Sequence, residues 1–152
     1  MACNGLIRLM RKSYLRRVPI LPRFISVMIR FLYSCEIQPT ADISPRAALI
    51  HRGLGCVFHE NVVIEDGVKI YQNVTLGGGS GKSNTGLEKG CDHPVIKKDA
   101  VKYAGACVLG PITVGENSIV GANAVVLQDV PPNSLAVGVP AVIKKNASRG
   151  DL

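Results

Sequence analysis

The sequence predicts an all-β domain in which six-residue units, three to a triangular coil, stack into a prism behind a short helical segment. Aliphatic residues recur every six positions, small or β-branched residues follow four places later in each unit, and the chain before residue 35 is basic. A six-residue unit is too short for a pair of helices, but it suits a short strand followed by a tight turn. The competing prediction is a β-sandwich with fortuitous spacing, which the two coincident registers disfavour.

Residues 1–34 are the first predicted element, a basic amphipathic helical cap. This segment carries seven Lys and Arg residues and no acid, whereas the rest of the chain is balanced between acids and bases. Because the excess charge is confined to one segment, nucleic-acid binding by the domain is not indicated. The apolar spacing after Pro22 favours a short helix, which either covers the open end of the prism or lies peripherally on a membrane. The first interpretation is favoured.

The chain shows no membrane-spanning or disulfide signature. No apolar run approaches the roughly 20 residues that cross a bilayer, and the arginines and prolines of residues 16–23 do not fit a signal peptide. A cytoplasmic location is therefore expected, with the inner face of the membrane as an option. The five cysteines are odd in number and form no Cys-x-x-Cys pair, so reduced thiols are expected and no metal site.

The repeat is predicted to occupy residues 35–143, followed by a C-terminal tail at 144–152. Its phase breaks between Leu49 and Phe58 and again between Leu76 and Ile96, and the second break predicts an extended loop over residues 77–94. In the second run only residue 102, a lysine, departs from the aliphatic register. The predicted inward positions are Ile37, Ile43, Leu49, Ile64, Ile70, Leu76, Ile96, Val108, Val114, Val120 and Val126, and the small or β-branched ones are Ala41, Ala47, Gly53, Val68, Val74, Ala100, Ala106, Ile112, Ser118 and Ala124.

Three stretches resemble signatures of the hexapeptide-repeat acyltransferases, in their serine acetyltransferase-like branch: YQNVTLGG at 71–78, HP at 93–94 and VVLQDVPPNSLAVGVPA at 125–141. The resemblance covers residues 35–144 and implies a left-handed parallel β-helix, although crossover connections are otherwise right-handed. It also implies a homotrimer with active sites between subunits. The EIQ at 36–38 and the short basic N-terminal segment are similar to exopolysaccharide (colanic-acid-type) O-acetyltransferases.

His51 is the expected general base. Transfer of an acyl group from a thioester to an alcohol needs a base that works near neutral pH, for which histidine is suited. Fifteen positions separate Glu36 from His51, which matches the family's spacing from its acid to its catalytic histidine. Glu36 would accept the other ring N–H of His51. His93 matches the family's second histidine, in the acceptor pocket across the subunit interface, unless it is only a turn residue before Pro94.

Other reactive side chains have weaker assignments. His59 is given no role. A covalent route through Cys56 or Cys91 is conceivable but disfavoured against direct transfer. The loop at 77–94 is expected to act as a flap over the acceptor site.

Two departures from the family bear on the acceptor. Serine acetyltransferases carry an aspartate directly before the catalytic histidine and an arginine before the second one, where this chain has Ile50 and Asp92. Without those charges a sugar hydroxyl becomes the expected acceptor, in a sugar or polysaccharide precursor. The alternatives are a serine O-acetyltransferase of cysteine biosynthesis and a non-catalytic β-helix that serves as a binding module.

Acetyl-CoA is the expected co-substrate, lying along the later coils. Lys102 and Tyr103 stand where the family usually has an inward aliphatic and a glycine, and a buried lysine is costly. A lysine pair at 144–145 is a candidate for the phosphates or, equally, part of a solvated tail. The predicted coenzyme-binding residues are Ala104, Gly105, Ala106, Gly121, Ala122, Lys144 and Lys145.

Overall fold

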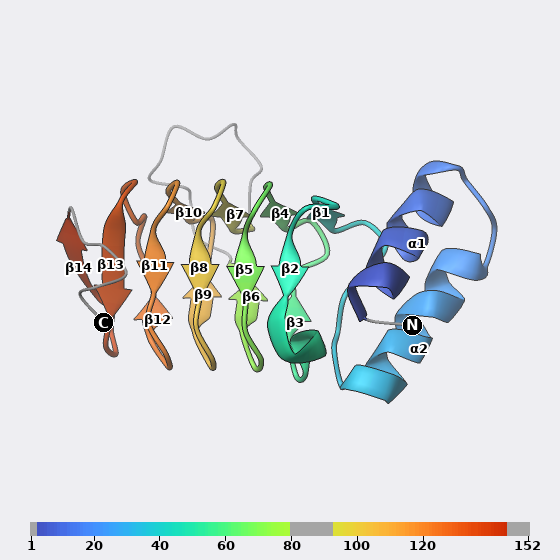
Figure 1. The fold of residues 1–152 in the computed structure, drawn as a ribbon, viewed down its shortest axis with the longest axis horizontal. Coiled ribbons are helices and arrows are strands. Elements are labelled where there is room, and N and C mark those ends of the chain that lie inside the picture. The colour runs from blue at the N-terminus through green and yellow to red at the C-terminus, as the bar shows by residue number, and fades with distance from the viewer. Residues whose placement is uncertain (1–2, 80–92, 146–152) are drawn as a thin grey trace.

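The computed structural model describes residues 3–79 and 93–145. Figure 1 shows an elongated stack of short strands with a helical hairpin at one end and the β13–β14 pair at the other. Most of the loop predicted at 77–94 lies outside the described residues. No helix among the described residues is long and apolar enough to cross a bilayer.

Two helices precede the prism, α1 (Cys3–Leu15) and α2 (Leu21–Tyr33). The sequence predicted only the second, which begins with a proline in its first turn and ends at Ser34, a residue in the left-handed conformation. Helix α1 was missed although its buried residues follow the three- and four-residue spacing of an amphipathic helix, at Cys3, Leu6, Ile7, Met10 and Ser13. It joins the hairpin to the first coil through Asn4, whose side chain accepts a hydrogen bond from the Leu49 N–H at 3.0 Å and donates one to the Leu49 carbonyl at 3.4 Å.

Fourteen short strands follow, with a 3-10 turn η1 (Ile50–Gly53) after the second. They are β1 (Asp42–Ile43), β2 (Ala48–Leu49), β3 (Val57–Phe58), β4 (Val63–Ile64), β5 (Lys69–Ile70), β6 (Thr75–Gly77), β7 (Val95–Ile96), β8 (Val101–Lys102), β9 (Cys107–Leu109), β10 (Thr113–Val114), β11 (Ile119–Val120), β12 (Val125–Val126), β13 (Ser134–Val137) and β14 (Val142–Lys145).

The strands form three sheets, and the chain visits the sheets in turn. The sheet orders are β1-β4-β7-β10, β14-β13-β11-β8-β5-β2 and β12-β9-β6-β3. Neighbouring strands are parallel except β13 and β14, which are antiparallel. A chain that passes from sheet to sheet and returns in parallel one coil later is a β-helix. Strand β14 continues the six-stranded sheet through Lys145, two residues beyond the boundary predicted for the tail.

The predicted inward register is confirmed. From the second coil onward its aliphatic side chains are at most 1 % exposed, and the small-residue register is at most 4 % exposed. Stacking of the coils therefore buries a continuous apolar column that no single unit could bury alone. Lys102 occupies the same register and is also fully buried.

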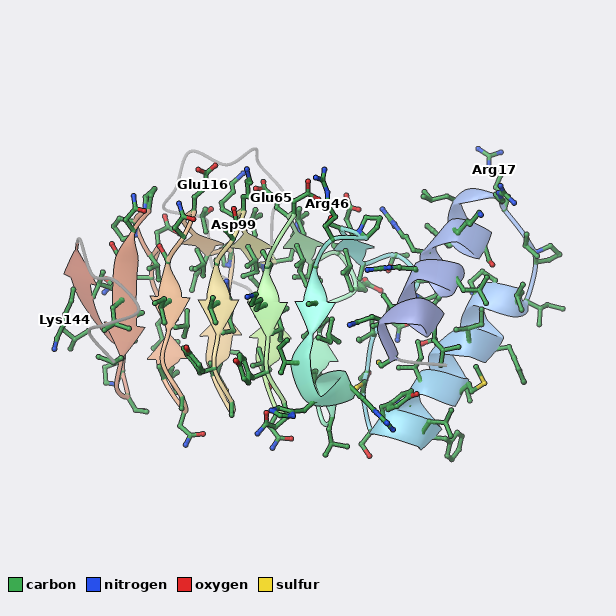
Figure 2. The ribbon with its side chains drawn as sticks, in the orientation of Figure 1. Arg17, Arg46, Glu65, Asp99, Glu116 and Lys144 are labelled. Atoms are coloured by element: carbon green, nitrogen blue, oxygen red, sulfur yellow. The ribbon has the colours of Figure 1, made fainter. Side chains whose placement is uncertain are left out.

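Polar residues at the corners let the chain turn sharply. Asn73, Asp99 and Asn123 adopt left-handed φ values of 55–58°, which Asn and Asp tolerate better than most residues. Gly105 has a φ of 71°, and a Cβ there would clash with the Asn123 side chain of the next coil. Figure 2 shows charged side chains along one edge of the prism, among them Arg46, Glu65, Asp99 and Glu116.

Candidate functional site

His51 lies in the turn η1, where the chain leaves the regular coil. His51 and its successor Arg52 both have left-handed backbones, with φ of 51° and 63°, a conformation that is uncommon for residues other than glycine and that collects at functional sites. The buried Cys35 thiol donates a hydrogen bond of 2.7 Å to the carbonyl of Gly53 at the end of this turn. This hydrogen bond fixes the end of the turn, while the His51 side chain is exposed.

The imidazole of His51 contacts the ring of Tyr71, with centroids 5.9 Å apart and planes at 60°. Within the described residues its side chain makes no hydrogen bond and no ion pair. The carboxylate of Glu36, predicted to accept a proton from His51, lies 3.6 Å from Nη1 of Arg30 at the end of α2. In the structure Glu36 therefore pairs with Arg30 of the helical cap. The Glu36–His51 pairing stays a prediction.

The backbone hydrogen bonds place residues predicted to bind the coenzyme in one row at a corner of the prism. The N–H of Asn73 donates to the carbonyl of Leu54, that of Gly105 to the carbonyl of Gln72, and that of Asn123 to the carbonyl of Ala104. Leu54, Gln72 and Ala104 therefore occupy equivalent places on successive coils, and Ala122 continues them on β11, which pairs directly with β8. Because strands of a sheet are about 4.8 Å apart, this corner row is about 14 Å long. His51 lies in the turn just before Leu54, and its ring contacts Tyr71, the residue that precedes Gln72.

The corner row offers backbone donors to a ligand. The N–H groups of Ala104 and Ala122 make no hydrogen bond with any of the described residues, whereas the carbonyl of Ala104 accepts one from Asn123. Ala122 is exposed and Ala104 half-buried. An extended ligand along the corner would find two unused donors one coil apart, with His51 beside the far end of the row.

Other predicted coenzyme residues have roles within the fold. The N–H of Gly121 donates to the carbonyl of Ala136, and a Cβ at Gly121 would clash with Val137, so the next coil requires this glycine. Ala106 is fully buried, and its N–H donates to the carbonyl of Tyr103. Gly105 is explained by its turn, as described above.

The lysine pair lies at the end of the prism opposite the helices. Figure 2 shows Lys144 at this end of the prism, and its side chain is exposed. In the strand register Lys144 of β14 is opposite Leu135, and Lys145, the last residue of that strand, is opposite Ser134. Both lysines therefore belong to the sheet. The sequence had also allowed the interpretation that they are part of a solvated tail.

His93 stacks on His59, the histidine to which the sequence assigned no role. Their ring centroids are 5.9 Å apart and their planes differ by 10°. Nδ1 of His59 also accepts a hydrogen bond of 3.2 Å from the N–H of Asn61. The pairing was missed because His59 precedes the 77–94 loop and His93 lies near the end of that loop. Asp92 falls outside the described residues, and Ile50 is half-buried at the start of η1.

The Cys56 thiol is unsuited to covalent catalysis. Cys56 is fully buried, and burial raises the pKa of its thiol to about 12, so almost no thiolate is present at neutral pH. Cys3, Cys35, Cys56 and Cys107 are all free thiols. Cys91, the other thiol considered, lies outside the described residues.

Comparison with known proteins places this geometry in a family. Residues 93–128 match the model of the bacterial transferase hexapeptide (six repeats). The chain is 45 % identical over 143 residues to a serine acetyltransferase of Bacillus subtilis, covering 93 % of this chain and 63 % of that protein. The serine acetyltransferase structure of Neisseria gonorrhoeae is 31 % identical with a TM-score of 0.82, covering 98 % of this chain and 56 % of the other.

A serine acetyltransferase solved in complex with CoA is 32 % identical with a TM-score of 0.79, covering 93 % of this chain and 55 % of that one. The chain thus spans about six tenths or less of the length of these relatives. Their names overturn the prediction of a sugar or polysaccharide acceptor, and with it the placement nearest the exopolysaccharide O-acetyltransferases. That prediction relied on two missing charges, and charges at single positions are weaker evidence than similarity along nine tenths of the chain. The repeats, the three sheets and these matches show that the chain belongs to the hexapeptide-repeat transferases.

Proposed function

We propose that this chain is an acetyl-CoA-dependent serine O-acetyltransferase with His51 as its general base. The observation that carries the proposal is the exposed His51 beside the corner row, against the tyrosine that precedes Gln72, together with the unused N–H groups of Ala104 and Ala122. The similarity to serine acetyltransferases supports L-serine as the acceptor. A soluble amino acid also gives the reaction no need for a membrane surface.

In the proposed reaction His51 removes the proton of the serine hydroxyl as its oxygen attacks the thioester carbonyl. The acetyl group passes directly to the serine oxygen and the carbon–sulfur bond breaks. The imidazolium then returns its proton to the departing thiolate, so the base is restored without an acyl-enzyme. Burial of the Cys56 thiol supports this direct route over a covalent one.

Acetyl-CoA supplies the activated acyl group, and the residues present fit an extended donor. Its arm would accept hydrogen bonds from the N–H groups of Ala122 and Ala104, with the thioester end at His51. The exposed Lys144 lies at the same end of the prism as Ala122 and is the candidate for contact with the phosphates. The exposure of Ala122 leaves this corner open to a ligand.

We further infer a left-handed coil and a homotrimer, supported by the relatives rather than by any contact within one chain. In such an assembly the corner row of one subunit would face a neighbour, which would complete the acceptor pocket with its His93. In this arrangement His51 of one subunit and His93 of its neighbour would face the same acceptor. The neighbouring subunit would also enclose the corner row on the side that is exposed in a single chain.

The test is thiol release from acetyl-CoA by the purified chain, with L-serine as acceptor and L-alanine, which lacks the hydroxyl, as the matched control. We expect thiol release that depends on L-serine, with O-acetyl-L-serine as the product identified by mass spectrometry. Equal thiol release with L-alanine, or none with L-serine in a folded protein, contradicts the proposal.

A further inference from the structure

Three aromatic rings stack along the prism beside the corner row. The ring of Tyr71 lies between His51, at 5.9 Å, and Tyr103, at 5.0 Å with planes 30° apart. Tyr71 and Tyr103 each follow a residue of the directly paired strands β5 and β8. The register therefore holds the two tyrosines at equivalent places on adjacent coils, with His51 at the free end of the stack.

The backbone of Tyr71 is fixed on both sides. Its N–H donates to the carbonyl of Lys102 at 2.9 Å, and its own carbonyl accepts a hydrogen bond of 3.2 Å from the buried Cys56 thiol. The N–H of Tyr103 donates in the same way to Val120 at 2.9 Å. Both rings thus project from rigid coils, and each is half-buried.

His51, by contrast, projects from a turn. Across residues 3–79 and 93–145 the Tyr71 ring is its one side-chain partner among hydrogen bonds, ion pairs and ring contacts. A general base must point its acceptor nitrogen at the substrate, and an exposed side chain without a fixed partner samples several rotamers. The rigid partner available to His51 is Tyr71.

We propose that Tyr71, supported from behind by Tyr103, is the positioning residue for His51. This inference rests on the proposed function and names a further residue for the same site. The aromatic contact restricts the imidazole to the orientation that faces the acceptor, and the electron-rich ring favours the imidazolium that forms as the proton moves. Contacts of this strength correspond to an effect of about 3- to 10-fold on kcat.

The contact is between rings, so the phenolic hydroxyl should be dispensable. No hydrogen bond from the Tyr71 hydroxyl is found within the described chain. Tyr71→Phe should therefore recover most of kcat, whereas Tyr71→Leu removes the aromatic face while it keeps an apolar side chain of moderate size. Tyr103→Leu should weaken kcat less than Tyr71→Leu does, because it acts through Tyr71.

The experiment compares Tyr71→Leu, Tyr71→Phe and Tyr103→Leu with the parent in serine-dependent thiol release, with Tyr14→Leu on α1 as a matched control outside the site. We expect Tyr71→Leu to lower kcat about 3- to 10-fold with little change in KM for either substrate. In a His51→Ala background the same substitution should have no further effect. Thermal unfolding of each variant shows whether the fold is intact.

Proton NMR of the His51 ring gives a readout independent of turnover. Tyr71→Leu should remove the ring-current shift of the His51 protons, and Tyr71→Phe should retain it. A folded Tyr71→Leu variant with parental kcat, or a Tyr71→Phe variant as impaired as Tyr71→Leu, overturns the inference. If His51→Ala itself retains parental activity, the proposed function fails; if it is inactive while Tyr71→Leu is fully active, only the positioning role fails.

Discussion

The Glu36 carboxylate lies 3.6 Å from the Arg30 guanidinium, and the two side chains are 45 % and 67 % exposed. An ion pair this open to solvent contributes about 0–1 kcal/mol. Glu36 can therefore leave Arg30 at little cost when His51 becomes positively charged. The observed pair is compatible with a carboxylate that supports the imidazolium only during the reaction.

Glu36→Gln should lower kcat by about tenfold or more if Glu36 supports the charged base, while Arg30→Gln should leave kcat within about twofold of the parent. The reason is that only the carboxylate, and not the ion pair, is needed in the reaction. Steady-state kinetics on both variants makes the comparison. Equal losses in the two variants would show instead that the ion pair itself is required.

Ile50→Asp should improve the use of L-serine. The half-buried Ile50 offers no charge to the serine ammonium, and the resembling enzymes carry an aspartate before their catalytic histidine. A charged partner adds about 1.5 kcal/mol, which corresponds to roughly a tenfold lower KM for serine. Ile50→Asn is the neutral control of similar size, and an equal fall of KM in both variants would rule out an electrostatic cause.

Lys102→Met should stabilise the fold. Nζ of Lys102 is buried without a hydrogen-bond partner among the described residues, and removing such a group is worth about 1–3 kcal/mol in the free energy of unfolding at pH 7. Lys69→Met is the matched control, since Lys69 is an exposed residue of the adjacent strand. Chemical denaturation of both variants measures the difference, and no gain for Lys102→Met over the control would contradict it.

The pH dependence of the same variants gives a separate test. Burial lowers the pKa of Lys102 well below its usual 10.5, so the folded chain holds a neutral amine where the unfolded chain holds an ammonium. The unfolded state therefore binds more protons, and the free energy of unfolding of the parent should rise with pH up to about 10.5. Other groups titrate in the same range, among them the Cys56 thiol, so the quantity compared is the difference between the parent and Lys102→Met. The advantage of Lys102→Met should shrink as the pH rises toward 10.5; a constant advantage would mean that protonation of Lys102 is not its source.

Ala122→Glu should raise KM for acetyl-CoA without lowering thermal stability. Ala122 is exposed in the corner row, so a longer side chain meets no packing restriction there, but its negative charge would repel the phosphates of the donor. Ala122→Gln separates charge from size. An unchanged KM for acetyl-CoA in both variants would place the donor elsewhere on the prism.

The core could be predicted from sequence because each coil repeats one rule. An inward side chain every six residues is enough to identify Ile70 and Val120 as buried members of one column, in which Lys102 lies between them. The contacts of the site follow no such rule. Tyr71 meets His51 only because the turn η1 rotates the histidine, and His59 meets His93 across a long loop, so neither pair leaves a periodic signal. Arg30, which pairs with Glu36, lies on helix α2, and the six-residue repeat does not determine how that helix packs.

Serine-dependent thiol release by His51→Ala, measured beside His59→Ala, tests the central claim most directly. The account predicts that His51→Ala loses about 10²- to 10⁴-fold in kcat, the range of a general base, because this side chain lies beside the end of the corner row where the thioester would lie. His59→Ala, at the corner that follows β3, should retain far more activity. A folded His51→Ala variant that turns over serine at the parental rate would contradict the account.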